Sequence, residues 1–260
     1  LSAGIFTRSY GEALDVELRV EAHERLCQLE RDEGLHLRRN GFLRLAHDPG
    51  GLAEFERAAA LQRELGVDDA VALDRAEIAR LVPDMSVDDL AGALLNPSDG
   101  YLDGQQLCMT YAERGERLGV RVLGRHPLTG YEQLPGDRHR LVTPRGSFDC
   151  DVVVNAAGAW APAVGELLGA PLEIVAERHE ACVMRLPAPL GYELPWIMDY
   201  VPGSGENGLY LRPEGERQLI AGLHSNDLLG DPADPDDFYA GAEQTEARLL
   251  ATLAAPILMA

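Results

Sequence analysis

A run of small residues that follows a β-branched stretch is the clearest feature of this chain that could serve a ligand. The apolar run 152–154 (Val-Val-Val) leads into residues 155–158 (Asn-Ala-Ala-Gly). Open α/β sheets bind ligands at the carboxyl ends of parallel strands, and residues as small as Ala and Gly let a flat cofactor or a phosphate approach the backbone. An ordinary strand-to-helix turn packed with small residues has the same pattern, so both interpretations stay open.

A glycine pattern typical of dinucleotide binding occurs once, at residues 203–208 (G-S-G-E-N-G). In a dinucleotide-binding fold this pattern lies between a strand and a helix whose N-terminus faces the pyrophosphate. Here it precedes a strand-like segment, residues 209–212, and no helix follows it. We therefore interpret it as a hairpin loop and not as a nucleotide site.

Metal and nucleophile chemistry have little support in the residue spacing. His23 and Cys27 lie one helical turn apart, and residues 178–180 (Arg-His-Glu) form a polar cluster, but neither group offers the three ligands of a typical metal site. There is no G-x-S-x-G nucleophile motif. We predict no metal site and interpret these residues as surface or packing residues.

The charge balance excludes several classes of function. The 260 residues contain 43 acidic and 23 basic residues, for a net charge of −20, and every basic residue is Arg. A broad nucleic-acid-binding surface is disfavoured because phosphates would be repelled. Lysine-dependent chemistry is excluded for these residues, so any cation that they contribute to a site is a guanidinium.

The apolar and cysteine patterns point to a protein of a reducing compartment. The longest uncharged apolar stretches, 152–165 and 249–260, are shorter than the ~20 residues of a membrane-spanning helix. No basic-then-apolar leader signals export. The four cysteines are scattered without a C-x-x-C pair and are expected to be small packing residues. We expect a cytoplasmic protein without a membrane span.

The elements that would position a site change in character along the chain. Helical spacing predicts helices in the first half, although residues 14–20 also fit a strand period; the predicted helices are 11–33, 52–65, 75–81 and 103–118. Gly34 suits a helix stop. Alternation predicts a strand at 41–45, a short strand at 120–123, and a hairpin with arms 128–133 and 139–143.

The second half is expected to carry most of the sheet structure. Residues 148–154 become apolar on both faces, which is typical of a central parallel strand, and a helix is predicted at 159–168. Strand-like segments separated by Pro and Gly turns then predict an antiparallel sheet; they are 173–186, 196–201, 208–213 and 218–223. A further helix is predicted from about residue 240.

Three stretches resemble the FAD-dependent amine and amino-acid oxidoreductases of the D-amino-acid oxidase superfamily, the branch with sarcosine oxidase and glycine oxidase. Residues 2–10 (S-A-G-I-F-T-R-S-Y) look like the small-residue turn that passes the flavin ring. Residues 99–103 (D-G-Y-L-D) resemble the family's entry back into the FAD domain. Residues 151–160 (D-V-V-V-N-A-A-G-A-W) are similar to the family's D-x-V-V-x-A-x-G-A-W strand and are the most specific of the three.

The resemblance implies roles for individual residues. FAD would be the cofactor, and the residues implied to bind it are Ser2, Ala3, Gly4, Ile5, Leu128, Ala156, Ala157, Gly158 and Trp160. Tyr210 would face the substrate over the flavin, and Arg212 or Arg8 could hold a substrate carboxylate, for which a guanidinium fork is well shaped. For Arg212 a salt bridge at a hairpin edge is an open alternative.

The resemblance also implies the fold and the reaction. We expect a mixed α/β fold in which an incomplete Rossmann-like FAD domain (1–40 and 96–169) is interleaved with an antiparallel-sheet substrate domain (41–95 and 170–260). The reaction would oxidise the C–N bond of an amino acid or secondary amine by hydride transfer to FAD, giving an imine. The family's N-terminal G-x-G-x-x-G and C-terminal segment have no counterpart in these residues, so we expect an interior portion of a longer chain that alone binds FAD weakly or not at all.

Two alternatives remain beside that reaction. A flavin dehydrogenase would pass its electrons to a quinone or a protein acceptor in place of oxygen. A non-catalytic accessory subunit would keep the sheet with a degenerate nucleotide site. A small-molecule amine or amino acid is the expected partner, with an electron acceptor or a second subunit as further partners.

Overall fold

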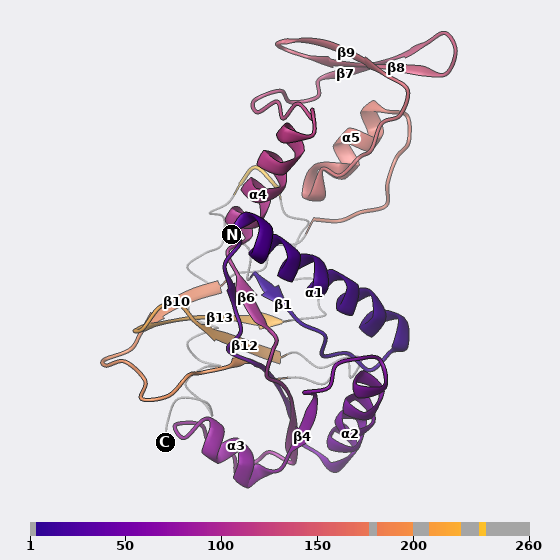
Figure 1. Cartoon of the computed structure of the whole chain (residues 1–260). Coiled ribbons are helices and arrows are strands. Elements are labelled where there is room, and N and C mark those ends of the chain that lie inside the picture. The colour runs from indigo at the N-terminus through magenta and orange to yellow at the C-terminus, as the bar shows by residue number, and fades with distance from the viewer. Residues whose placement is uncertain (1–3, 177–180, 200–207, 225–233, 238–260) are drawn as a thin grey trace. The chain divides into compact units, whose positions relative to one another are not determined.

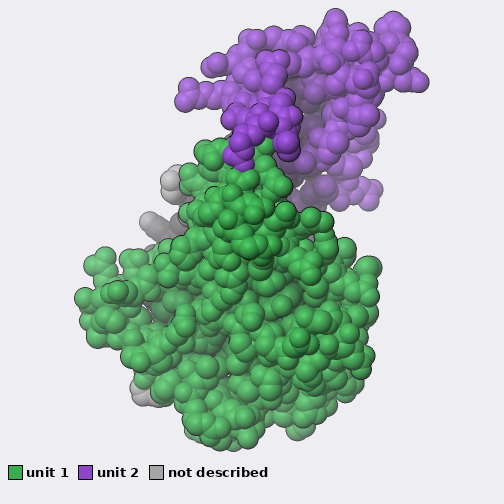
Figure 2. All heavy atoms as spheres, viewed as in Figure 1, with its two compact units in different colours: residues 1–114, 179–227, 241–260 green, residues 115–178, 228–240 purple. Residues whose placement is uncertain are grey.

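The computed structural model describes residues 4–176, 181–199, 208–224 and 234–237. The chain forms two compact units, each described by itself below (Figure 2). Unit 1 contains residues 1–114, 179–227 and 241–260, and unit 2 contains residues 115–178 and 228–240. The predicted helix from residue 240 and the cluster at 178–180 lie outside the described residues.

Unit 1 is built on a seven-stranded sheet with the strand order β10-β13-β12-β11-β3-β5-β4 (Figure 1). The strands are β3 (Phe42–Ala46), β4 (Val71–Leu73), β5 (Gly92–Asn96), β10 (Ala181–Arg185), β11 (Trp196–Asp199), β12 (Gly208–Pro213) and β13 (Gln218–His224). The predicted antiparallel sheet of the last third is confirmed. Its strand β11 also pairs in parallel with β3, which joins two segments far apart in sequence into one sheet.

A smaller sheet in unit 1 holds the start of the described chain. Its strands are β1 (Ile5–Phe6), β6 (Gly100–Leu102) and β2 (Leu37–Arg38), with β6 in the middle. Gly4 has a φ of 66°, and a Cβ at this position would lie 2.0 Å from the carbonyl oxygen of Leu102. Glycine is therefore required where β1 approaches β6.

Among the described residues, four helices begin in unit 1: α1 (Ala13–Glu33), α2 (Pro49–Glu64), α3 (Arg75–Leu81) and α4 (Gly104–Arg117), whose last residues belong to unit 2. Gly34 ends α1 in the left-handed conformation, as predicted. Asp74 and Glu77 form a capping box on α3. At α4, Asp103 accepts hydrogen bonds from the N–H groups of Gln105 and Gln106, which caps the helix at the predicted start.

The core of unit 1 lies on both faces of the large sheet. One face carries a cluster that includes Leu43, Leu45, Ile78, Ile197 and Leu211, all buried. The other face is covered at one end by α2, with Ala46 and Phe55 buried between them. Residues two apart on a strand share a face. Leu43 and Leu45 of β3 therefore face the first cluster, and Phe42 and Ala46 face the opposite side of the sheet.

Unit 2 differs from its sequence-based prediction at two strands. The predicted hairpin is confirmed as β7 (Gly130–Leu134) and β8 (Arg138–Thr143), and β9 (Gly146–Cys150) adds a third antiparallel strand. Residues 120–123 form no strand, and the predicted parallel strand at 148–154 is wrong. Its first residues belong to β9, and residues 152–154 are unpaired among the described strands. An apolar run predicts burial, but a central strand also needs hydrogen-bonding neighbours on both edges, and no described segment supplies them.

Unit 2 continues with a 3-10 turn at Gly158–Trp160 and with α5 (Ala161–Leu167), where a helix was predicted. The mixed α/β class is confirmed. The domain boundaries at residues 40, 95 and 169 stay a prediction. Among the described residues, no helix is long and apolar enough to cross a membrane. All four cysteines are free thiols.

Candidate active site

The aromatic cluster on one face of the large sheet is the most promising site in unit 1. Phe42, Trp196 and Met198 are buried there, and Ile5, Tyr101 and Tyr210 pack against them half-buried. The pairings of Trp196 with Phe42 and of Met198 with Tyr210 bring three strands into register. The Trp196 and Tyr210 rings are stacked, with centroids 5.9 Å apart and an interplanar angle of 16°.

Gly222 makes room for the ring of Tyr210. It lies opposite Tyr210 in the β12–β13 pair, and a Cβ on Gly222 would lie 2.3 Å from the phenol oxygen. Any side chain at position 222 would therefore displace the ring. Burial raises the pKa of Tyr210 above its ordinary value, so the phenol stays protonated at neutral pH.

Arg212 brings a buried positive charge to this cluster. Its guanidinium carbon lies 4.5 Å from the ring centroid of Tyr101 and 5.8 Å from that of Trp196. Its Nη1 donates hydrogen bonds to Glu214 and to the carbonyl oxygen of Pro213. The salt bridge named as an alternative for Arg212 is thus present, but Nε is buried and has no hydrogen-bond partner among the described residues.

The indole N–H of Trp196 is a second buried donor without a partner in the described part of the chain. Buried donors left unpaired cost free energy. Trp196 Nε1 and Arg212 Nε are thus two donors at this cluster that could each take an acceptor.

Arg8, the other arginine predicted to hold a carboxylate, lies in a buried ion pair. Its Nε donates to Asp99 at 2.8 Å, and its backbone N–H donates to the second carboxylate oxygen at 2.7 Å. Asp99 has no exposed surface. Burial raises the pKa of Asp99, while the Arg8 charge and the donated hydrogen bonds favour its ionised form.

The predicted cofactor residues lie in both units. Ser2 and Ala3 lie outside the described residues; Gly4 and Ile5 lie at β1, with Ile5 inside the aromatic cluster. In unit 2, Leu128 is half-buried just before β7. Because the two units are described separately, no contact between these unit 2 residues and the aromatic cluster is stated.

The turn at residues 155–158 has an open flank. Asn155 braces it, because its Oδ1 accepts from the N–H of Ala157 and its Nδ2 donates to the carbonyl of Ala161. Gly158 has a φ of 56°, and a Cβ there would meet no atom within 4 Å. Trp160, which is 42% exposed, donates from Nε1 to Asp236. Gly158 therefore leaves open space beside the backbone, next to the small residues Ala156 and Ala157.

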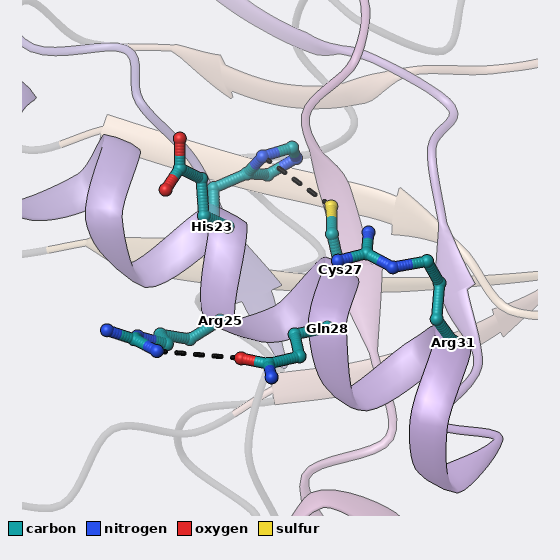
Figure 3. Close-up of a pocket in the computed structure, with 6 residues that line it drawn as sticks. His23, Arg25, Cys27, Gln28 and Arg31 are labelled. Atoms are coloured by element: carbon teal, nitrogen blue, oxygen red, sulfur yellow. Dashed lines mark hydrogen bonds between the residues drawn. The ribbon is translucent and has the colours of Figure 1, made fainter.

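The surface hollow on α1 has a different character (Figure 3). It has a volume of about 420 Å³ and is lined by His23, Glu24, Arg25, Cys27, Gln28 and Arg31. His23 Nδ1 lies 3.8 Å from the Cys27 sulfur, which also accepts from Arg39. No group of three His, Cys, Asp or Glu residues suited to a metal occurs among the described residues.

Sequence reasoning missed several residues of the site. Phe42, Trp196 and Gly222 were not singled out, and Asp99 and Tyr101 were named only as part of the stretch 99–103 and not as site residues. Arg44, inside an otherwise apolar strand, was a signal that the sequence offered. A charge in a buried strand needs polar or aromatic partners, and here these are the Ser9 carbonyl and the Phe42 ring. The parallel pairing of β11 with β3, which brings Trp196 to Phe42, has no signal in either segment alone.

Comparison with known proteins identifies a family whose sequence pattern this chain matches. Residues 1–257 match the family model described as "DAO: FAD dependent oxidoreductase". Human mitochondrial sarcosine dehydrogenase is 33% identical over 224 residues, which cover 82% of this chain and 24% of that protein. The mouse mitochondrial pyruvate dehydrogenase phosphatase regulatory subunit is 25% identical over 233 residues, which cover 86% of this chain and 25% of that protein. The chain thus spans about a quarter of the length of these relatives.

Solved structures share the fold. An L-proline dehydrogenase from P. horikoshii matches 97% of this chain and 67% of its own with a TM-score of 0.77 and 20% identity. Glycine oxidase from Geobacillus kaustophilus matches 98% of this chain and 67% of its own with a TM-score of 0.71 and 21% identity. The predicted likeness to sarcosine-oxidising and glycine-oxidising flavoproteins is confirmed at the level of family and fold.

Proposed function

Because the chain belongs to the FAD-dependent oxidoreductase family, we propose that the full protein oxidises the C–N bond of an amino acid or a secondary amine. FAD, when bound, accepts a hydride from the substrate carbon that bears the amine, and water then hydrolyses the resulting imine. The name of the sarcosine dehydrogenase relative supports an N-methyl amino acid as substrate.

One observation supports this placement of the chemistry more than any other. Ile5 comes from the segment implied to line the flavin, and Tyr210 comes from the strand implied to face the substrate; both pack in the aromatic cluster. Two segments that are far apart in the sequence therefore pack in one cluster, as the proposed placement of cofactor and substrate requires.

Arg212 is our choice for binding the substrate carboxylate. Its unpartnered Nε–H can donate to a carboxylate oxygen beside the aromatic cluster, whereas the Nε and the backbone N–H of Arg8 are bonded to Asp99, whose charge already offsets that of Arg8. In this proposal Arg8 stabilises the fold through its ion pair with Asp99. Tyr210, stacked on Trp196, contacts the substrate and orients it.

The residues proposed to bind FAD are those that the family resemblance implies. Ser2, Ala3, Gly4 and Ile5 would lie along the flavin ring. Residues implied to contact the adenine, ribose and phosphates would be Leu128, Ala156, Ala157, Gly158 and Trp160. The FAD domain would comprise residues 1–40 and 96–169. The predicted cytoplasmic location has no support from the human and mouse relatives named above, which are mitochondrial.

The experiment uses the full-length protein purified with its flavin. Glycine, sarcosine, dimethylglycine and proline are each tested for bleaching of the visible flavin band without oxygen, then for oxygen consumption and for dye reduction. Arg212→Met is expected to raise KM on the order of 100-fold, because a charge-assisted hydrogen bond is lost. Arg217→Met, at an exposed arginine near the β12–β13 turn, is the matched control. An equal effect of both variants would contradict the role of Arg212.

Two other functions are favoured by specific observations. The dehydrogenase name of the sarcosine relative favours a non-oxygen electron acceptor; dye reduction without oxygen consumption would support it. The regulatory-subunit relative favours an accessory role. A full-length protein that binds no FAD would support the accessory role and contradict the enzyme.

A further inference from the structure

The buried polar side chains of unit 1 converge on one short segment, residues 7–10. Apart from Thr110 and Arg212, every buried polar residue in the described part of the chain belongs to this segment, bonds it, or, in the case of Asn96, bonds a residue that does. These residues are Arg8, Ser9, Arg44, Gln62, Asn96 and Asp99. Such a concentration is unusual in a core, because each buried polar group must find a partner.

The segment follows β1, and no strand in the described ranges pairs with it. Pairing of β1 with β6 ends at Phe6, and residues 7–10 are neither helix nor strand. Side chains take over the bonds that a neighbouring strand would make. Asp99 accepts from the N–H of Arg8 at 2.7 Å and from the hydroxyl of Thr7 at 2.9 Å.

The other side of the segment is held from β3 and α2. Arg44 Nε donates to the carbonyl of Ser9 at 3.1 Å, and Gln62 Nε2 donates to the carbonyl of Tyr10 at 2.8 Å. Asn96 in turn donates to Gln62 Oε1 at 2.7 Å, which fixes the orientation of that amide. Strand β3 and helix α2 thus fix two successive carbonyls.

Two further contacts make the arrangement rigid. The Tyr10 ring lies 3.6 Å below the guanidinium carbon of Arg19, and Arg44 lies 4.9 Å from the centroid of Phe42 in the aromatic cluster. Arg44 therefore connects the segment to the cluster directly. A well-packed apolar core would stabilise the fold at least as well as these buried charges, so their benefit is the geometry that they impose.

We propose that Asp99, Arg44 and Gln62 are positioning residues that hold residues 7–10, and through them Ile5, in the place where the flavin ring binds. This inference rests on the proposed function. It assigns roles to residues that touch neither the substrate nor the reacting atoms: they order the segment before the cofactor arrives, which lowers the entropic cost of binding.

The test compares mild variants with a matched control in the full-length protein. Thr7→Val and Gln62→Met each remove hydrogen bonds to or within this network with little change in shape. Thr110→Val is the control, because the buried Thr110 hydroxyl bonds only within α4, to the carbonyl of Gln106. FAD affinity of the apoprotein is measured by flavin fluorescence, alongside hydrogen exchange of the Arg8 amide and the unfolding midpoint.

We expect Thr7→Val and Gln62→Met to weaken FAD binding about fivefold each, as for the loss of one net hydrogen bond, and to speed exchange of the Arg8 amide. Thr110→Val should leave FAD binding and the exchange of the Arg8 amide unchanged, even if it lowers the unfolding midpoint as much as the other two variants do. If the wild type binds FAD and all three variants bind it alike, the positioning role is wrong and the proposed function stands. If the wild type binds no FAD, both are wrong.

Discussion

Units 1 and 2 differ in how much of their apolar side chains they bury. In unit 1, Phe42, Leu43 and Ile197 are at most 1% exposed and belong to continuous clusters. In unit 2, Leu118, Val152 and Val154 are 79%, 74% and 81% exposed, and Ala161 is its only buried hydrophobic residue among those described. The geometry of the aromatic cluster therefore has a packed core behind it, whereas the turn at 155–158 is held mainly by hydrogen bonds of Asn155.

Removal of a carboxylate tests this difference most strongly. Asp99→Ala leaves the Arg8 guanidinium buried without its main partner and should lower the free energy of unfolding by about 3–5 kcal/mol. Asp149→Ala removes the partner of Arg140 on the surface of unit 2 and should leave the midpoint unchanged, because exposed pairs contribute little. Both are measured by urea denaturation, and comparable losses would contradict the contrast.

Truncation of a buried leucine is expected to give the next largest loss in the free energy of unfolding. Leu43→Ala opens a cavity in the main cluster and is expected to cost about 3 kcal/mol. Leu118→Ala makes the same chemical change at an exposed position in unit 2 and should cost less than about 0.5 kcal/mol. A cost of several kcal/mol at Leu118 would show that the apolar surface of unit 2 is covered in the full protein.

Helix capping gives a smaller effect, and one helix in each unit lacks a side-chain cap bond, α1 at Glu12 and α5 at Trp160. Asp74→Ala removes the capping box of α3 and should cost about 1 kcal/mol. Asp74→Asn should retain most of the stability, since its side chain still accepts from the N–H of Glu77; equal losses in both variants would argue against a capping role.

The smallest expected effect depends on pH. His47 bonds Asp199 at 2.6 Å and lies 3.3 Å from Asp89. Burial lowers the pKa of His47, but the bond to Asp199 and the two negative charges outweigh it and leave the pKa raised. The pair therefore stabilises unit 1 fully below the ordinary pKa of about 6.5 and loses this contribution as the pH rises through the raised value.

His47→Gln should therefore lower stability by about 0.5 kcal/mol at acidic pH, a small figure because the imidazole is half-exposed, and have no effect at alkaline pH. His126→Gln in unit 2, where the ring bonds the carbonyl of Gly124, is the control. A loss that grew with rising pH would contradict the assignment.

Local signals predicted local structure well. The caps at Gly34 and Asp103, the helix Arg75–Leu81 and the strand Gly208–Pro213 follow from residue types within a few positions. The prediction of a parallel strand at 148–154 was wrong because the apolar run 152–154 indicates residues that favour burial, but it does not indicate whether a neighbouring strand is present.

The site was predictable only in part. Tyr210, Arg212 and Ile5 were selected by resemblance, and the structure brings them into or beside one cluster. Trp196, Asp99 and Gly222 act through contacts with residues far away in sequence, so their roles become visible only when β11 pairs with β3 and residue 99 reaches Arg8. A single sequence contains no record of these pairings.

Anaerobic reduction of the full-length protein by sarcosine tests the central claim most directly. The account predicts that the wild type carries flavin and that its visible band bleaches on mixing. Arg212→Met should retain the flavin and require on the order of 100-fold more substrate for the same rate, while Arg217→Met behaves as the wild type. A flavin-loaded wild type that no amino acid or secondary amine reduces would contradict the account.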